Sequence, residues 1–327
     1  MRILLTTFLL LALLPAPVQA ENPRVWMEID RGVIVLELDA VYAPVTTQNF
    51  IDYVDAGFFD GLVFHRVIRD FVIQSGGFTR DFDFRDPILP PITSEAQNGL
   101  ANVNGTIAMA LSAGNVNSGQ SQFFINLGTN AHLDDDFTVF GRVIMGDEVV
   151  DQLGALRTGP KSTPYGVLSD SPLTPPLIQR AVVFHGEFPI MPLHTGSWFD
   201  PANPGVGFNV EVANDASTEA GPVLVVYWYD FNEGRPLWLT GTATFEYGAT
   251  ELSVDLLAVP GPAPLADFQT PPPLSEYEVR GSLTVSFSDC RTGRFSYDLP
   301  DFGSGEVAVT RLTLPDRASC DGLISAQ

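Results

Sequence analysis

Five blocks of the sequence carry residue types that could do chemistry: Phe64-His65-Arg66-Val67-Ile68, Phe71-Val72-Ile73-Gln74-Ser75-Gly76-Gly77, Gly105-Thr106-Ile107-Ala108-Met109-Ala110, Ser121-Gln122-Phe123-Phe124-Ile125-Asn126 and Val139-Phe140-Gly141-Arg142-Val143. The first block contains Arg66, and an arginine side chain is always charged, rigid and rich in hydrogen-bond donors. Such a group acts by electrostatic stabilisation and requires neither a covalent step nor a proton transfer. The sequence shows no nucleophile elbow, zinc motif or phosphate loop, so the chemistry of those motifs is not expected.

The region that contains these blocks, residues 24–184, alternates short β-type runs with two predicted helices. The runs 25–29 and 32–38 predict a β-hairpin, because apolar residues alternate along them. One helix is predicted to begin at Pro44 and to be stopped by Gly57. The second is predicted from Asp147 to about Leu156, with acidic residues in its first turn.

Residues 185–195 lose this periodicity and contain Gly186, Pro189 and Pro192, so they predict a linker. Beyond the linker, residues 196–327 form aromatic and β-branched runs that glycine and proline interrupt, and no helical period is sustained. This pattern predicts a β-rich second domain, either an antiparallel β-sandwich or a small barrel. The expected fold class of the whole chain is therefore mainly β.

Residues 1–20 have the layout of a secretory signal peptide. Arg2 precedes a mostly apolar run from Ile3 to Leu14, and small residues lead to Ala20. This run is too short for a bilayer core, which needs about 20 residues, and no later segment is apolar for long enough. We expect cleavage after Ala20, a periplasmic or secreted protein, and no membrane span.

Charge and cysteine content narrow the function classes further. The 327 residues carry a formal net charge of −22, and such a surface repels phosphate backbones, so no nucleic acid partner is expected. Cys290 and Cys320 are expected to form a structural disulfide in an oxidising compartment. No metal site is expected, because histidines at ligand spacing are missing near the cysteines and the acidic run 134–136 is typical of a solvated turn.

Taken in order and at their spacing, the five blocks resemble the signature sequences of cyclophilins, particularly the short periplasmic bacterial kind. The resemblance covers about half of the chain, from the first hairpin to the second helix. It implies a closed eight-stranded antiparallel β-barrel capped by two helices, with a substrate groove on the outer face. It also implies a peptidyl-prolyl cis/trans isomerase that binds proline-containing polypeptide clients in an extended form and needs no cofactor.

The resemblance makes Arg66, Phe71 and Gln74 the catalytic set. Rotation about a peptide bond is slow because the nitrogen lone pair is delocalised into the carbonyl. A donor aimed at the proline nitrogen, or at the carbonyl that follows it, opposes this delocalisation. That task is assigned to the guanidinium of Arg66, while Phe71 helps to wall an apolar pocket and Gln74 holds a carbonyl of the peptide.

The substrate-binding positions that the resemblance implies are Phe124, Leu133, Gln122, Ala110, Leu111, Val72, His132 and Phe137. The apolar members would hold the proline ring, Gln122 would hold a carbonyl, and the backbone of Ala110 and Leu111 would pair with the extended substrate. His65 and Phe123 neighbour site residues, but side chains alternate along a strand, so both are expected to be structural.

Four of these positions depart from the family pattern. Val72 stands where methionine is usual, and Leu111 stands where asparagine is common. His132 replaces tryptophan or phenylalanine, and Phe137 replaces histidine. Because the Arg66 set is intact, activity is expected, with a shifted specificity and a modest pH sensitivity of binding from His132.

The second domain leaves two further hypotheses open. Aromatic runs such as Tyr227-Trp228-Tyr229 could stack on sugars or contact a partner, but the sequence favours a role in the core of this domain. Besides an isomerase of exported proteins, the chain could be a peptide-binding or chaperone protein with little turnover. It could also be an envelope or glycan-binding protein that acts through the C-terminal domain.

Overall fold

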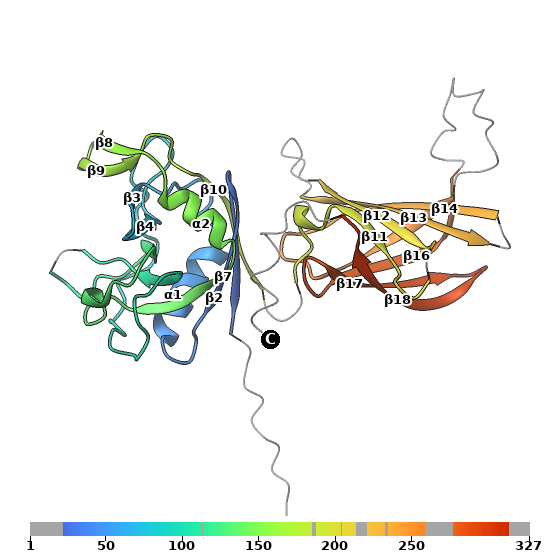
Figure 1. Ribbon diagram of the computed structural model, residues 1–327, viewed down its shortest axis with the longest axis horizontal. Helices are drawn as coiled ribbons and strands as arrows, with labels where there is room; N and C mark the ends of the chain where they lie inside the picture. Colours follow the sequence, from blue (N-terminus) through green and yellow to red (C-terminus); the bar gives the residue numbers. More distant parts are fainter. Residues whose placement is uncertain are drawn as a thin grey trace, which may run out of the picture.

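The computed structural model describes residues 22–112, 114–184, 188–203, 205–213, 221–232, 235–258 and 277–313. The elements of its N-terminal half are β1 (Arg24–Ile29), β2 (Gly32–Leu38), α1 (Pro44–Asp55), β3 (Arg66–Ile68), β4 (Val72–Ser75), β5 (Thr106–Met109), β6 (Phe123–Asn126), η1 (Ala131–Leu133), β7 (Val139–Met145), α2 (Asp147–Gly154), β8 (Thr158–Thr163), β9 (Gly166–Pro172) and β10 (Ile178–Phe184). Those of its C-terminal half are η2 (Pro192–His194), β11 (Gly196–Phe199), β12 (Gly207–Ala213), β13 (Val223–Asn232), β14 (Arg235–Thr244), β15 (Glu251–Ala258), β16 (Glu278–Phe287), β17 (Thr292–Leu299) and β18 (Gly303–Arg311). The two halves lie side by side (Figure 1).

The N-terminal half is built on one antiparallel sheet with the strand order β10-β1-β2-β7-β5-β6-β4-β3. The two edges of this sheet meet where residues 62–64, which precede β3, lie beside residues 176–178, at the start of β10. There the Phe64 amide donates to the Pro176 carbonyl at 2.9 Å, and the Ile178 amide donates to the Leu62 carbonyl at 2.8 Å. The curled sheet with two helices confirms the mainly β, cyclophilin-like fold that the sequence predicts.

The core of this half lies between the sheet and α1. Phe50 of α1 is buried, and its ring contacts those of Phe59, Phe123 and Phe140 at centroid distances of 5.0, 5.3 and 5.2 Å. Such aromatic contacts stabilise a core beyond the area they bury. Because Phe123 points into this core, its neighbour Phe124 is directed to the opposite face of β6.

Helix α1 begins at Pro44, as predicted, and its first turn is held by a distant carboxylate. Glu95 accepts hydrogen bonds from the amides of Val45 at 3.0 Å and Thr46 at 2.8 Å. These amides have no partner within the helix, and a negative charge at a helix N-terminus is favourable. Gly57, with a φ of 63°, follows the end of the helix where the sequence places its stop signal.

The C-terminal half is a closed barrel in which β11 to β18 are hydrogen-bonded in sequence order. Closure occurs between β11 and β18, where Trp198 is paired with Arg311 and Phe199 with Thr310. Of the two predicted architectures, the barrel is therefore the one that forms. Its interior is filled by large apolar side chains, which include Trp198, Phe208, Trp228, Phe287 and Phe295.

One end of this barrel contains a buried polar cluster. Arg311 donates to the backbone carbonyls of Leu193 and Thr195, and the ring of His194 stacks on Phe287 at 3.9 Å. Burial, together with the Arg311 charge, lowers the pKa of His194 to about 3. His194 is therefore a neutral structural residue, whose Nδ1 accepts a hydrogen bond from the Met191 amide.

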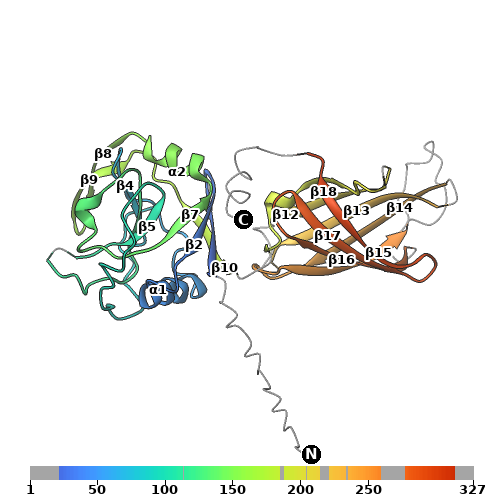
Figure 2. The same ribbon diagram turned by 60° about the horizontal axis from the view of Figure 1, so that its bottom comes forward.

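The two halves share one apolar interface. β10, β2 and β7 are nearer to the C-terminal barrel than β4 in both views (Figures 1 and 2). The outer face of this part of the sheet supplies buried Trp26, Val35, Ile144 and Met145, which belong to the same hydrophobic cluster as the barrel core. The segment predicted to be a linker also supplies buried residues, Phe188, Ile190 and Met191. Its described part is therefore packed between the halves.

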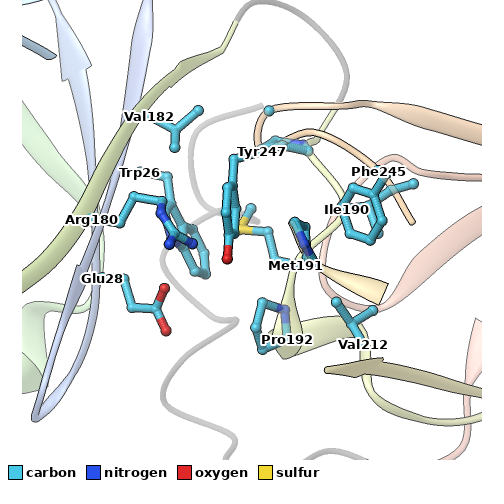
Figure 3. A pocket seen from close by; sticks show the side chains of 13 residues that line it. Trp26, Glu28, Arg180, Val182, Ile190, Met191, Pro192, Val212, Phe245 and Tyr247 are labelled. Carbon is cyan, nitrogen blue, oxygen red and sulfur yellow. The ribbon is translucent and has the colours of Figure 1, made fainter. Parts of the chain in front are cut away.

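A small pocket marks this interface (Figure 3). The guanidinium carbon of Arg180, in β10, lies 3.1 Å from the ring centroid of Tyr247, which follows β14. Such a cation–π contact is strengthened when it is removed from water. Glu28 is paired across the strands with Arg180, and burial raises the pKa of its carboxyl. The interface is thus apolar with a few charged groups at its margin.

Some predictions concern residues outside the described ranges. Residues 1–20, residues 185–187 and Cys320 lie there, so the signal peptide and the Cys290–Cys320 disulfide stay predictions. Cys290 itself is buried. Among the described residues, the structure contains no helix with the length and apolar character needed to cross a membrane.

Candidate active site

Two of the three predicted catalytic residues, Arg66 and Gln74, belong to a row of paired residues across adjacent strands. Arg66 of β3 is paired with Gln74 of β4, Gln74 is paired with Phe124 of β6, and Phe124 is paired with Ala108 of β5. Directly paired residues project from the same face of a sheet, with Cβ atoms about 5 Å apart. The row therefore places a guanidinium, an amide and an aromatic ring on one face.

Hydrogen bonds fix the orientation of the polar end of this row. Arg66 Nη1 donates to Gln74 Oε1 at 3.2 Å, and Gln74 Nε2 donates to Gln122 Oε1 at 3.0 Å. A guanidinium can only donate, so it requires the oxygen of the Gln74 amide to face it. For the same reason, the amide of Gln122 turns its oxygen toward Gln74 Nε2. The Nε2 donor of Gln122 then remains available for another partner.

Two glycines make room for this arrangement. A Cβ on Gly77 would lie 2.9 Å from Gln122 Cδ, and a Cβ on Gly76 would lie 2.3 Å from the Ser121 carbonyl oxygen. Gly76 also has a φ of 89°, in the left-handed region that favours glycine. The Gly76-Gly77 pair is therefore required by the close approach of β4 to the segment that carries Gln122.

An apolar cluster adjoins the row. Its buried members are Val72, Ala108, Phe124, Leu133 and Val139, and the partly buried residues packed against them are Phe71, Leu100, Ala110 and Phe137. The sequence predicts Phe71, Phe124 and Leu133 as pocket walls, and the structure brings these three together. It also adds Ala108, Val139 and Leu100, which the sequence reasoning did not assign to the site.

The positions that depart from the family pattern lie around this cluster. His132 is exposed and stacks on Phe71 with ring centroids 5.7 Å apart and an interplanar angle of 15°. Phe137 meets Phe124 edge-on at 5.7 Å. Val72 belongs to the same buried cluster, with 2% of its surface exposed against 4% for Phe124.

A network of buried polar side chains holds the loop that carries Leu133, and the sequence reasoning missed it. Asn126 donates to Asn102 Oδ1 at 3.1 Å, and Asn130 donates to the Phe71 carbonyl at 2.9 Å and to Asn126 Oδ1 at 2.8 Å. Asp134 accepts from the Asn102 amide at 2.7 Å. Asparagine is unfavourable in strands, so Asn126 within an otherwise apolar strand is the signal that could have indicated this role.

A cavity of about 100 Å³ with a partly polar lining adjoins the row at Gln122. Its lining includes Ala110, Leu111, Gln122, Ser112 and Phe84. The Ala110 amide donates to the Gln122 carbonyl at 2.9 Å, which leaves the Ala110 carbonyl as its group for pairing with a substrate. If Ala110 pairs with a substrate as predicted, it does so by accepting a hydrogen bond at its carbonyl oxygen.

The two neighbouring residues predicted to be structural are buried away from the row. Phe123 is fully buried among core aromatic rings. His65 is 2% exposed, and its ring packs on Phe78 at 4.8 Å. Burial lowers the pKa of His65 to about 4, so it is neutral at physiological pH.

The described part of the chain contains no group of three or more His, Cys, Asp or Glu side chains that could bind a metal ion. The functional groups of the row are therefore a guanidinium, two amides and an apolar wall. This arrangement can bind an extended peptide and polarise one of its amide bonds.

Comparison with known proteins agrees with the geometry. Residues 24–183 match the family described as "Cyclophilin type peptidyl-prolyl cis-trans isomerase/CLD". Peptidyl-prolyl cis-trans isomerase A of Dickeya dadantii (strain 3937) is 39% identical over 183 residues, which cover 54% of this chain and 93% of the relative. Peptidyl-prolyl cis-trans isomerase cyp18 of Streptomyces antibioticus is 43% identical over 160 residues, covering 46% of this chain and 93% of the relative.

The chain therefore belongs to the cyclophilin-type peptidyl-prolyl cis-trans isomerase family. Its activity is that of a peptidyl-prolyl cis-trans isomerase, and proline-containing peptides fit as its substrates. The C-terminal barrel, β11 to β18, lies beyond the matched residues.

Proposed function

We propose that this isomerase acts on X-Pro bonds of exported polypeptides and that Arg66 stabilises the twisted amide electrostatically. The observation that carries the proposal is the cross-strand row, in which Arg66 and Phe124 flank Gln74. The guanidinium is thus held beside an apolar wall rather than in open solvent. No covalent intermediate is required.

The physical task is to reduce double-bond character in the C–N bond. The rotation barrier of an ordinary peptide bond is about 18–20 kcal/mol, and it arises from delocalisation of the nitrogen lone pair. A donor that reaches the proline nitrogen, or the carbonyl after it, favours the twisted state in which the lone pair is localised. The apolar wall excludes water from this point, and the hydrogen bond is stronger in the weaker dielectric.

The bond from Arg66 to Gln74 gives the guanidinium a fixed position before substrate binds. Donors that are already oriented lose little entropy in the transition state. Gln122, at the end of the same hydrogen-bonded chain, has its Nε2 available to bind a peptide carbonyl. Phe71, Phe124 and Leu133 supply the walls for the proline ring.

Export is the second part of the proposal, and the layout of residues 1–20 supports it. The protein would then be periplasmic or secreted and would meet clients as they fold. The expected observation is a mature chain that begins at Glu21, measured by the intact mass of the protein recovered outside the cytoplasm. Recovery of the uncleaved chain from the cytoplasm would contradict it.

The activity is tested by NMR exchange spectroscopy on a proline-containing peptide, with no coupled protease. We expect exchange cross-peaks between the cis and trans forms at substoichiometric protein. Peptide binding without exchange would instead support the alternative of a chaperone or peptide-binding protein with little turnover. A role of the C-terminal barrel toward an envelope partner or a glycan stays a prediction.

A further inference from the structure

Four aromatic side chains form a strip on the outside of the C-terminal barrel. Phe231 and Trp238 are 64% and 69% exposed, and Tyr227 and Tyr229 are each 38% exposed. We name these four residues the aromatic strip. Tyr229 is paired with Trp238 across β13 and β14, and their rings meet edge to face at 5.5 Å.

The strip results from strand alternation. Along β13, Leu224, Val226 and Trp228 are buried in the barrel, so Tyr227, Tyr229 and Phe231 project outward. The barrel interior is already filled, and the strip contributes nothing to it. Isolated exposed aromatics are ordinary, whereas several on adjacent strands mark an interaction surface.

The surroundings of the strip are acidic. Asn209 and Gly207 of β12 are paired with Tyr227 and Tyr229, and exposed Glu211 lies two residues farther on the same face. On the other side, Leu257 of β15 is paired with Thr240, and exposed Asp255 lies two residues away. β14 begins at Arg235, whose side chain lies outside the described part of the structure, and none of the side chains described in β12 to β15 is a lysine or an arginine.

We propose that the aromatic strip binds cationic, extended segments of a polypeptide. Lysine and arginine side chains bind over tyrosine and tryptophan rings by cation–π attraction, and Glu211 and Asp255 complement their charge. The chain uses this contact itself, where Arg180 lies over Tyr247. A neutral glycan fits less well, because it gains nothing from the carboxylates and because the perpendicular rings of Tyr229 and Trp238 do not form a flat platform.

This inference goes beyond the proposed function, because the strip lies outside the residues that match the isomerase family. The barrel would then hold a polypeptide substrate through its cationic residues, whether or not the bound segment contains proline. A polypeptide bound at the strip would be retained near the isomerase half, at a raised effective concentration.

The test measures fluorescence anisotropy of a fluorescein-labelled nonapeptide of alternating arginine and glycine. This probe contains no proline, so it lacks the ring that the apolar wall of the Arg66 groove is proposed to hold. We expect saturable binding that weakens with added salt. Trp238→Ala and Tyr229→Ala should each raise Kd about three- to tenfold, as expected for the loss of one cation–π contact.

Matched variants separate the strip from the general acidity of the protein. Phe302→Ala removes a 42% exposed aromatic from the turn after β17 of the same barrel, and its Kd should equal that of the unchanged protein. Asp255→Asn should weaken binding, whereas Glu306→Gln, on β18, should not. Equal losses in Trp238→Ala and Phe302→Ala, or no loss in either, would overturn the proposal.

A neutral oligosaccharide such as maltohexaose serves as the competing ligand. Saturable binding of this sugar that Trp238→Ala abolishes, with no binding of the arginine peptide, would replace the proposal with a glycan site. Because Trp238 is largely exposed, melting curves of its variant should match those of the unchanged protein, which excludes misfolding as the cause of lost binding.

Discussion

The interface between the two halves gives a sharp prediction for Trp26→Ala. Trp26 lies on β1 with 4% of its surface exposed and belongs to the hydrophobic cluster that continues into the C-terminal barrel. A buried tryptophan covers roughly 200 Å², which at about 25 cal/mol per Å² corresponds to ~5 kcal/mol. Truncation of buried aromatic residues to alanine lowers stability by about 3–5 kcal/mol, so the two estimates agree.

The assay is guanidinium unfolding followed by circular dichroism. The free energy of unfolding falls by about 5 kcal/mol per molar guanidinium, so a loss of about 3–5 kcal/mol lowers the unfolding midpoint by about 0.6–1 M. The matched control is Trp238→Ala, which removes the same side chain from a 69% exposed position and should change stability by no more than about 0.5 kcal/mol. Isomerase activity should stay within about twofold in both variants, because Trp26 and Trp238 lie outside the catalytic row.

The reasoning would be refuted if Trp26→Ala shifted the midpoint no more than Trp238→Ala does. That result would mean that the outer face of the sheet is not buried against the barrel in solution. A large shift accompanied by lost activity would place Trp26 in contact with the groove, which would also contradict the structure.

Further predictions concern groups away from this interface. Buried His65 and His194 have pKa values lowered to about 4 and about 3, whereas the unfolded chain protonates its histidines near pH 6.5, so stability should fall as the pH drops from about 7 toward 4. At pH 5.5 the loss is on the order of 1 kcal/mol for each histidine, and His65→Gln should reduce the slope of melting temperature against pH. Gly77→Ala should displace Gln122 and lower kcat/KM about tenfold, whereas Gly159→Ala, whose Cβ meets only Leu173 at 3.4 Å, should not. Glu95→Ala should lower stability by about 1–2 kcal/mol in thermal unfolding, because two helix amides lose their acceptor; an unchanged melting temperature would contradict that role.

The catalytic row could be predicted because its signal is local. Arg66, Phe71 and Gln74 lie within nine positions of one another, in two of the blocks whose resemblance to cyclophilins implies the catalytic set. Phe123 and Phe124 could also be assigned to opposite faces, since strand alternation requires it. The structure places Phe123 and Phe124 in different clusters, as alternation requires, and pairs Arg66 with Gln74, while the catalytic roles stay predictions.

The supports of the site could not be predicted because their partners are distant in sequence. Glu95 holds a helix that begins about 50 residues earlier, and Asp134 holds Asn102 across 32 positions. Nothing in the sequence near either residue indicates its partner. Such contacts become visible only when the register of the strands is known.

The orientation of the aromatic residues in the second domain also could not be predicted from the sequence. The sequence favours a core role for them, and Trp198 and Trp228 are indeed buried, but Tyr227, Tyr229 and Trp238 face outward. Alternation separates Trp228 from its neighbours, yet it does not say which set faces the interior. The predicted linker is a related case, because the apolar Phe188, Ile190 and Met191 become buried only against a partner surface that the sequence does not reveal.

The most direct test of the central claim compares Arg66→Ala with Arg80→Ala in NMR exchange of a proline-containing peptide at saturating concentration. Arg80 is a matched control, because its side chain is 61% exposed and pairs with Asp30 outside the row. The account predicts that Arg66→Ala lowers the exchange rate on the order of 10²–10³-fold with little change in peptide Kd, and that Arg80→Ala leaves both unchanged. An exchange rate in Arg66→Ala equal to that of the unchanged protein would contradict the assignment of the guanidinium as the catalytic group.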